Sequence, residues 1–178
     1  MAKLRPRARI VRTIGDQLIS GPEAALIELV KNAYDADSPS VNIRIIPPGS
    51  LQEGRQPGEI IVVDTGHGMS ANDITTKWFE PATTDKVERG TSPSGRRLLG
   101  AKGVGRFATA RLGSVLHLTS SHKEIGKLRQ VSEFKVSWQL FEETQYLDEV
   151  EIDIATRRGG ESDTDGVTLK ITDLRDPW

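Results

Sequence analysis

The sequence predicts an α+β fold in which helices cover one face of a β-sheet. Helical spacing dominates its first half, whereas its second half is mainly a succession of strand-like runs separated by turns. A sheet with one apolar face must bury that face against another layer, so we expect a two-layer sandwich. The 178 residues suffice for one core, and we expect residues 1–178 to form a single domain.

The first expected helix covers residues 9–19. Its apolar side chains at Ile10, Ile14 and Leu18 have the spacing of one helix face. Together with the residues before it, this helix forms an N-terminal arm that we assign to residues 1–20.

A second helix is expected over residues 22–36. Ser20 and Glu23 have the spacing of a capping box, in which a hydroxyl and a carboxylate each bond a free main-chain amide. Two strands are expected next, over residues 41–46 and 59–64. The first alternates β-branched with polar residues, and the second is a short apolar run.

A short helix is expected after Ser70. Ser70 and Asp73 repeat the capping-box spacing, and Ile74 and Trp78 share one helical face. The pattern then stops over residues 80–103, which are rich in Gly, Ser, Thr, Pro and charge. A loop of this length inside a compact domain is either disordered or a functional lid.

Beyond this loop, the sequence predicts one helix and then most of the sheet. The helix begins near residue 103 and carries Phe107, Ala110 and Arg111. Four strands are expected, over residues 115–120, 131–140, 150–156 and 167–174.

The composition excludes several classes of site and partner. The chain has no cysteine, which excludes disulfides and thiolate metal sites, and its net charge of -1 does not imply a polyanionic partner. No run approaches the ~20 apolar residues of a membrane span, so we expect a cytoplasmic protein with no membrane partner. The chain ends directly after a strand, and we expect it to be the N-terminal fragment of a longer protein.

Three polar side chains share one face of the second expected helix. Glu28, Asn32 and Asp35 are spaced i, i+4, i+7. A carboxylate can polarise a water molecule and an amide oxygen can bind a hard cation, which suits a magnesium and phosphate site. The alternative is a solvated helix face.

Asp64 ends the second expected strand and is followed by Gly66, Gly68 and Met69. The two glycines allow a sharp turn and the close approach of a flat ligand. A carboxylate at this point can accept a hydrogen bond from the amino group of adenine, whereas guanine would present a carbonyl. The alternative is a plain hairpin turn.

A glycine-rich segment from Gly100 to Gly105 joins the long loop to the next helix. Its main-chain amides, the positive end of the helix and Lys102 all favour an anion, so the segment predicts phosphate binding. It is neither a Walker A sequence nor a Rossmann fingerprint.

Taken in order, the three motifs resemble the nucleotide-binding boxes of the GHKL superfamily. This superfamily includes gyrase-type ATPases, large heat-shock chaperones, histidine kinases and MutL-like repair proteins. The resemblance implies the Bergerat fold, a mixed and mainly antiparallel sheet layered under helices. It also implies ATP and Mg²⁺ as ligands beneath a mobile lid over residues 80–103. The string that begins at Glu28 and continues through Asn32 and Asp35 resembles the one found in the chaperone, MutL and MORC-like branch of the family.

The same resemblance implies a role for each residue of the site. Glu28 resembles the general base, Asn32 the Mg²⁺ ligand, and Asp64 the adenine reader. The other implied nucleotide contacts are Asp35, Gly66, Gly68, Met69, Thr84, Lys86, Lys102, Gly103, Val104, Gly105 and Thr168. Thr168 is included because the family places a threonine one position earlier, where this chain has Val167.

The leading interpretation is an ATPase that acts as a nucleotide-gated conformational or dimerisation switch. The alternatives are an ATP-binding module without turnover and a histidine-kinase-like catalytic domain. The expected partners are ATP and ADP, a second copy of the chain and downstream domains, with nucleic acid left open. Seven basic residues are interpreted as solvated: Lys3, Arg5, Arg7, Arg9, Arg12, Arg96 and Arg97.

Overall fold

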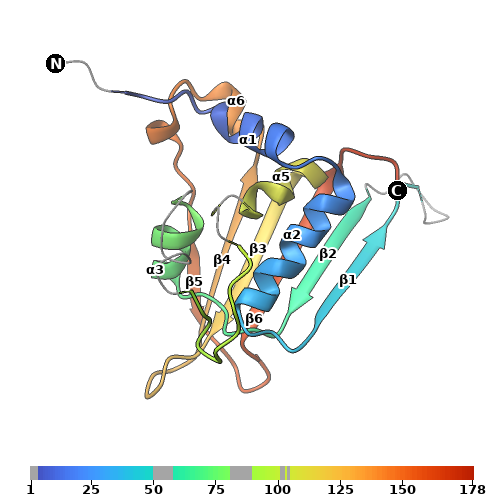
Figure 1. The fold of residues 1–178 in the computed structure, drawn as a ribbon. Helices are drawn as coiled ribbons and strands as arrows, with labels where there is room; N and C mark the ends of the chain where they lie inside the picture. The colour runs from blue at the N-terminus through green and yellow to red at the C-terminus, as the bar shows by residue number, and fades with distance from the viewer. Residues whose placement is uncertain (1–3, 50–57, 81–89, 101–102, 104) are drawn as a thin grey trace.

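A computed structural model describes residues 4–49, 58–80, 90–100, 103 and 105–178 (Figure 1). In this part of the chain a β-sheet forms one layer, and helices lie across one of its faces (Figure 1). The covering helices are α1 (Ile10–Leu18), α2 (Pro22–Asp35) and α5 (Ala108–Leu112). The predicted α+β sandwich is confirmed.

Within the described residues the sheet has six strands in the order β1-β2-β6-β3-β4-β5. The strands are β1 (Val41–Ile46), β2 (Glu59–Asp64), β3 (Gly113–His122), β4 (Gln130–Ser137), β5 (Ala155–Arg158) and β6 (Gly166–Leu174). Each neighbouring pair among them is antiparallel, whereas the family resemblance had implied some parallel pairing. Because β6 lies between β2 and β3, the last strand joins the two parts of the sheet.

Alternate residues of the strands face the helices and form the core. Ile60 and Ile171 are fully buried, and they belong to one apolar cluster with Leu29 of α2. Side chains alternate between the two faces of a strand. Asp64 therefore lies on the same helix-covered face as Ile60 and Val62.

α2 begins without its predicted capping box. Its N-cap is Gly21, no side chain caps it, and Pro22 is the first helical residue. The prediction for Ser20 and Glu23 is therefore wrong. Proline suits this position because the first helical amide has no partner within the helix.

The second predicted capping box is confirmed. Ser70 caps the single turn α3 (Ala71–Asp73), and the Ser70 and Asp73 side chains each bond the other residue's main-chain amide. The chain continues directly as a π-helix, η1 (Ile74–Trp78), whose Ile74 is fully buried.

β4 is shorter than predicted. It ends at Ser137 rather than at residue 140, because Trp138 begins a turn into the short helix α6 (Leu140–Glu143). Trp138 is only 3% exposed, so its apolar character serves the core rather than a strand.

The strand predicted over residues 150–156 is wrong for most of its length. β5 begins only at Ala155, some residues after the 3-10 turn η3 (Leu147–Glu149). Ile152 and Ile154 alternate as in a strand, and they pack against the core without forming a ladder.

The N-terminal arm packs on the chain. Arg7 forms an antiparallel bridge with Tyr146, and the guanidinium of Arg5 lies 3.8 Å from the centroid of the Tyr146 ring. Arg5 also pairs with Asp148 and Glu149. Arg5 therefore combines ion pairing with cation–π contact, and the guanidinium of Arg7 lies 4.8 Å from the centroid of the same ring. Both residues are exposed, as predicted, but they also have partners within the chain.

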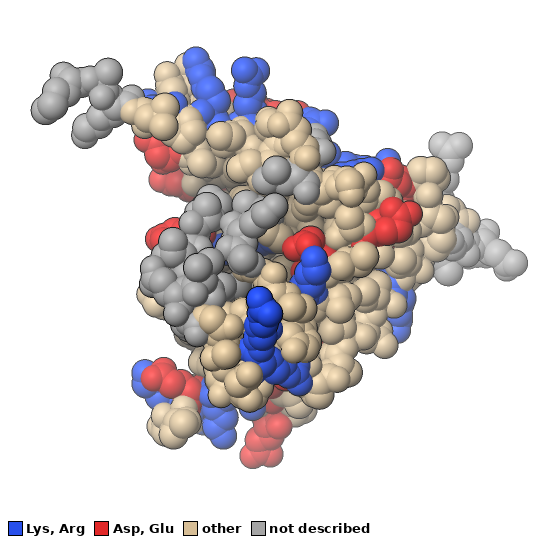
Figure 2. Space-filling model, in the orientation of Figure 1, with Lys and Arg blue, Asp and Glu red and all other residues tan. Residues whose placement is uncertain are grey.

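Charge is distributed without a dominant patch on the face shown in Figure 2. Lys and Arg side chains are interspersed with Asp and Glu across this view, which matches the net charge of -1. No helix of the described residues has the length and apolar character required to cross a bilayer.

Candidate functional site

α2 forms one wall of the candidate site, because the other two motifs both contact it. The motif after β2 reaches the C-terminal end of the helix, where His67 N donates to Ala36 O at 3.0 Å. The glycine-rich segment reaches the middle of the helix at Glu28 and Asn32. Two segments that are far apart in the sequence therefore meet at this helix.

Gly105 lies directly against the polar face of α2, at the start of the 3-10 turn η2 (Gly105–Phe107). A Cβ at Gly105 would lie 3.0 Å from Glu28 Oε2 and 3.7 Å from Asn32 Oδ1. A side chain here would fill the space in front of these groups. Carboxylate and amide oxygens are the donors that Mg²⁺ prefers, so the residues present fit a phosphate with its cation.

Glu28 is held by a lysine one turn along the same helix. Lys31 Nζ lies 2.7 Å from Glu28 Oε1, while Oε2 is the oxygen nearest to Gly105. The ion pair therefore orients the carboxylate with one oxygen directed to the glycine-rich segment.

Asp64 ends β2 with a partly buried carboxylate. Its Oδ1 accepts the main-chain amides of Gly66 at 2.9 Å and Val167 at 3.3 Å. Burial raises the pKa of the Asp64 carboxyl, and these two hydrogen bonds offset part of that rise. Because both bonds end on Oδ1, Oδ2 can accept a hydrogen bond from an amino group.

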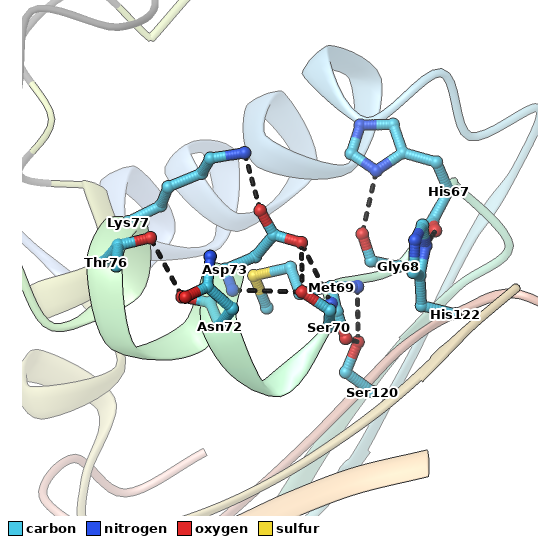
Figure 3. A network of polar contacts seen from close by, with 10 residues as sticks. All are labelled: His67, Gly68, Met69, Ser70, Asn72, Asp73, Thr76, Lys77, Ser120 and His122. Atoms are coloured by element: carbon cyan, nitrogen blue, oxygen red, sulfur yellow. Dashed lines mark hydrogen bonds and ion pairs between the residues drawn. The ribbon is translucent and has the colours of Figure 1, made fainter. Parts of the chain in front are cut away.

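The turn after Asp64 is clamped to β3 (Figure 3). Ser120 is fully buried, and its Oγ accepts from Met69 N at 2.7 Å and donates to Met69 O at 3.1 Å. Gly68 has φ of +64°, and a Cβ there would lie 2.0 Å from Ser121 O. Only glycine fits at this position without displacing β3.

Sequence reasoning missed Ser120, although a signal was present. Ser120 continues the alternation of Leu116 and Leu118 on the helix-covered face of β3. A polar side chain at an expected core position is informative, because buried polar groups require specific partners.

The β-sheet register separates Thr168 from Asp64. Thr168 pairs with Val63, so its side chain lies on the sheet face opposite to that of Asp64. Val167 shares the face of Asp64 and pairs with Ser120. In place of a hydroxyl, this chain supplies the Val167 main-chain amide to the Asp64 carboxylate.

Asp35 is directed at the main chain rather than at an open space, which differs from the nucleotide contact predicted for it. Its Oδ1 accepts from Leu99 N at 2.8 Å and its Oδ2 from Gly100 N at 3.1 Å. Only 6% of Asp35 is exposed. The residue therefore connects α2 to the start of the glycine-rich segment.

Arg96 is also more than a solvated side chain, so its interpretation from the sequence is wrong. Its Nη1 donates to Ser38 O at 2.8 Å, and its guanidinium lies 5.1 Å from the centroid of the Tyr34 ring. Two residues before it, Ser94 N donates to Asp37 Oδ2 at 2.9 Å. Residues 92–97 are thus fastened to the C-terminal end of α2.

Several predicted contacts lie outside the described residues: Thr84, Lys86, Lys102 and Val104. Gly103 is described and has φ of +63°. Among the described residues no group of three or more His, Asp or Glu side chains is arranged to hold a metal ion. A cation beside Asn32 would therefore depend on phosphate and water oxygens, as is usual for Mg²⁺.

Comparisons with known proteins show which proteins this chain resembles. Residues 19–162 match the family described as histidine kinase-, DNA gyrase B-, and HSP90-like ATPase. A candidate type II restriction enzyme, HgiDII of Herpetosiphon aurantiacus, is 33% identical over 94 residues, which cover 53% of this chain and 14% of that protein.

Two similar proteins are named DNA mismatch repair protein MutL. The protein from Phocaeicola vulgatus is 26% identical over 138 residues, covering 77% of this chain and 21% of the relative. The protein from Halobacterium salinarum is 28% identical over 112 residues, covering 63% of this chain and 15% of the relative. The chain thus spans between 14% and 21% of the length of these three relatives.

Proposed function

Because the chain belongs to the histidine kinase-, DNA gyrase B-, and HSP90-like ATPase family, we propose that it binds ATP with Mg²⁺ and hydrolyses it. One observation carries the proposal. The turn that follows Asp64 contacts the C-terminal end of α2, and Gly105 contacts its middle, where Glu28 and Asn32 lie. A base pocket and a phosphate pocket can therefore be filled by one nucleotide.

The base is recognised at Asp64. In this proposal the carboxylate accepts the adenine amino group at Oδ2, while the main-chain amides of Gly66 and Val167 hold Oδ1. Gly68 and Met69 line the pocket, and Ser120 fixes their turn. Guanine would place a carbonyl opposite the carboxylate, which leaves two acceptors facing each other.

The terminal phosphate is hydrolysed in front of α2. Glu28 accepts a proton from a water molecule as the water oxygen bonds to the γ-phosphorus and the bond to the β,γ-bridging oxygen breaks, which releases ADP and phosphate. Bound Mg²⁺ neutralises phosphate charge, and Asn32 is the proposed protein ligand for it. Lys31 orients the Glu28 carboxylate through its ion pair.

A phosphotransfer reaction to a histidine within this chain is not favoured. His67 lies in an exposed turn, and His117 and His122 lie on β3, so none of the three histidines stands on a helix. An ATP-binding module without turnover remains the competing proposal, and the Glu28 variant described in the Discussion separates the two.

We further propose that residues 1–178 act as one nucleotide-gated unit of a longer protein, with residues 80–103 as its lid. The names of the relatives link them to DNA, and we propose that the longer protein acts on DNA. Sedimentation of the longer protein with ATP, with a non-hydrolysable analogue and without nucleotide tests the dimerisation switch. The switch predicts a dimer only when a triphosphate is bound. Unchanged sedimentation would contradict the switch.

Adenosine is expected to lower the pKa of Asp64. Burial raises that pKa above its ordinary value, so the ionised form that accepts the adenine amino group is lost as the pH falls through the raised pKa. A ligand that selects the ionised form must lower the pKa by linkage. A carbon-detected NMR titration of the Asp64 carboxyl, with and without adenosine, measures the change.

The pH dependence of the stability of the nucleotide-free protein is opposite to that of adenine binding. Because the folded pKa of Asp64 is raised, its contribution to stability is present below the unfolded pKa and is lost as the pH rises through the folded pKa. If adenosine leaves the titration midpoint of the Asp64 carboxyl unchanged, this carboxylate does not bind the base.

Ser120→Ala is expected to weaken adenosine binding by about tenfold, which corresponds to roughly 1.4 kcal/mol. The substitution removes both hydrogen bonds that hold Met69, and it leaves Met69 N without its acceptor. Calorimetry with adenosine provides the measurement. Ser137→Ala, at an exposed position on β4, serves as the control, and equal affinities for the two variants would refute the clamp.

A further inference from the structure

The start of the glycine-rich segment is fastened to α2 by a buried charge. Both carboxylate oxygens of Asp35 are used, because Oδ1 accepts Leu99 N and Oδ2 accepts Gly100 N. Hydrogen bonds to a charged acceptor are shorter and stronger than neutral ones. A carboxylate that is 6% exposed also depends on such partners, since burying an unpaired charge is costly.

The end of the same segment is fastened by a second charged side chain. Arg106 follows Gly105 directly, and its Nη1 donates to Trp78 O at 2.6 Å and to Glu80 O at 3.2 Å. Burial lowers the pKa of Arg106 to about 10, so the guanidinium remains charged at neutral pH. The residue therefore ties the start of η2 to the end of η1.

Asp35 is the first anchor of the glycine-rich segment and Arg106 is the second. In the proposed function, the groups that face the phosphates lie between them. Asp35 is on the same helix as Glu28, seven residues later, and a helix rises about 1.5 Å per residue. The distance between the anchor and Glu28 is therefore fixed by one rigid element. Gly105, beside the second anchor, is the residue whose Cβ would meet Glu28 Oε2.

A longer attachment supports the first anchor. Residues 92–100 run beside the C-terminal half of α2 (Figure 1), where Asp37 accepts Ser94 N and Arg96 donates to Ser38 O. The hydrogen bonds of Asp35 therefore belong to a series of contacts made by the end of α2 and the residues that follow it.

We infer that Asp35 and Arg106 are positioning residues that hold the two ends of the glycine-rich segment in place for the phosphates before a nucleotide binds. The inference rests on the proposed ATP site. It assigns both residues to the affinity for the triphosphate and not to the recognition of the base, which occurs at Asp64.

Asp35→Asn tests this division. Asparagine has the same shape but one accepting oxygen, so its amide group would oppose one of the two main-chain donors. The affinity for ATP with Mg²⁺ is expected to fall by about ten- to a hundredfold, while the affinity for adenosine stays within about twofold. Hydrogen exchange of Leu99 and Gly100 amides in the nucleotide-free protein is expected to accelerate.

The matched control is Asp163→Asn. Asp163 also accepts a main-chain amide, from Gly160 at 2.8 Å, but it lies in the connection between β5 and β6. Both affinities are expected to match the wild type. A second pair tests the other anchor, because Arg106→Lys keeps the charge and is expected to lose less ATP affinity than Arg106→Gln.

The outcomes separate the inference from the proposed function. Equal losses of ATP and adenosine affinity in Asp35→Asn would show a general structural role and overturn the inference. Unchanged ATP affinity in this variant, beside normal binding by the wild type, would overturn it as well. A wild-type protein that binds neither ligand would instead refute the ATP site itself.

Discussion

Asp64→Asn is expected to weaken ATP binding at least about a hundredfold, the largest effect on affinity expected for a single substitution. The Asp64 carboxylate already accepts the amides of Gly66 and Val167 at one oxygen, and the other oxygen is proposed to accept the adenine amino group. Asparagine offers one accepting oxygen. If that oxygen keeps the main-chain bonds, its NH₂ group faces the amino group of adenine, and two donors then oppose each other.

Isothermal titration calorimetry with ATP and Mg²⁺ measures this loss. Asp148→Asn is a suitable control, because Asp148 is an exposed carboxylate on η3 that pairs with Arg5 far from the base pocket. The control is expected to bind like the wild type. Micromolar ATP affinity in Asp64→Asn would remove Asp64 from its role as adenine reader.

Glu28→Gln is expected to stop ATP turnover while ATP still binds. Glutamine keeps the size of the side chain and an accepting oxygen beside Gly105, but its amide does not act as a base. General base catalysis typically contributes a factor of about 10² to 10⁴, and we expect a loss of this size. Steady-state phosphate release by the longer parent protein is the appropriate assay.

Glu23→Gln provides a control on the same helix. Glu23 lies exposed in the first turn of α2, away from Gly105. ATP turnover by the Glu23→Gln variant is expected to equal that of the wild type. If Glu28→Gln also turns over normally, the base assignment is wrong, and if the wild type binds ATP without turnover, the competing proposal of a binding module gains support.

The secondary-structure elements that carry Asp64 and Glu28 were predictable from the sequence, because local periodicity marks both elements. Asp64 ends an apolar strand, and the Glu28 stripe lies on a helix that the apolar spacing marks clearly. The helical spacing of the first half and the strand-like runs of the second also predicted the two layers. These features depend on local spacing, which a single sequence contains.

The contacts between distant segments were not predictable in the same way. Asp35 has helical spacing with Glu28, but its acceptance of Leu99 N and Gly100 N depends on how the later loop returns to α2. The face on which Thr168 lies depends on a strand register that a shift of one residue would reverse.

The contacts of the N-terminal arm were also not predictable from the sequence. Its basic residues read as a solvated terminus, yet the Tyr146 ring and the carboxylates of η3 hold Arg5. Nothing in residues 1–12 identifies that partner, because the partner comes from a segment much later in the chain.

The most direct test of the account compares ATP with GTP as ligands of the wild-type chain. In calorimetric titrations with Mg²⁺, ATP is expected to bind saturably at one site, and GTP at least about a hundredfold more weakly, because guanine opposes the Asp64 carboxylate with an acceptor. Equal binding of the two nucleotides, or no binding of ATP, would contradict the account.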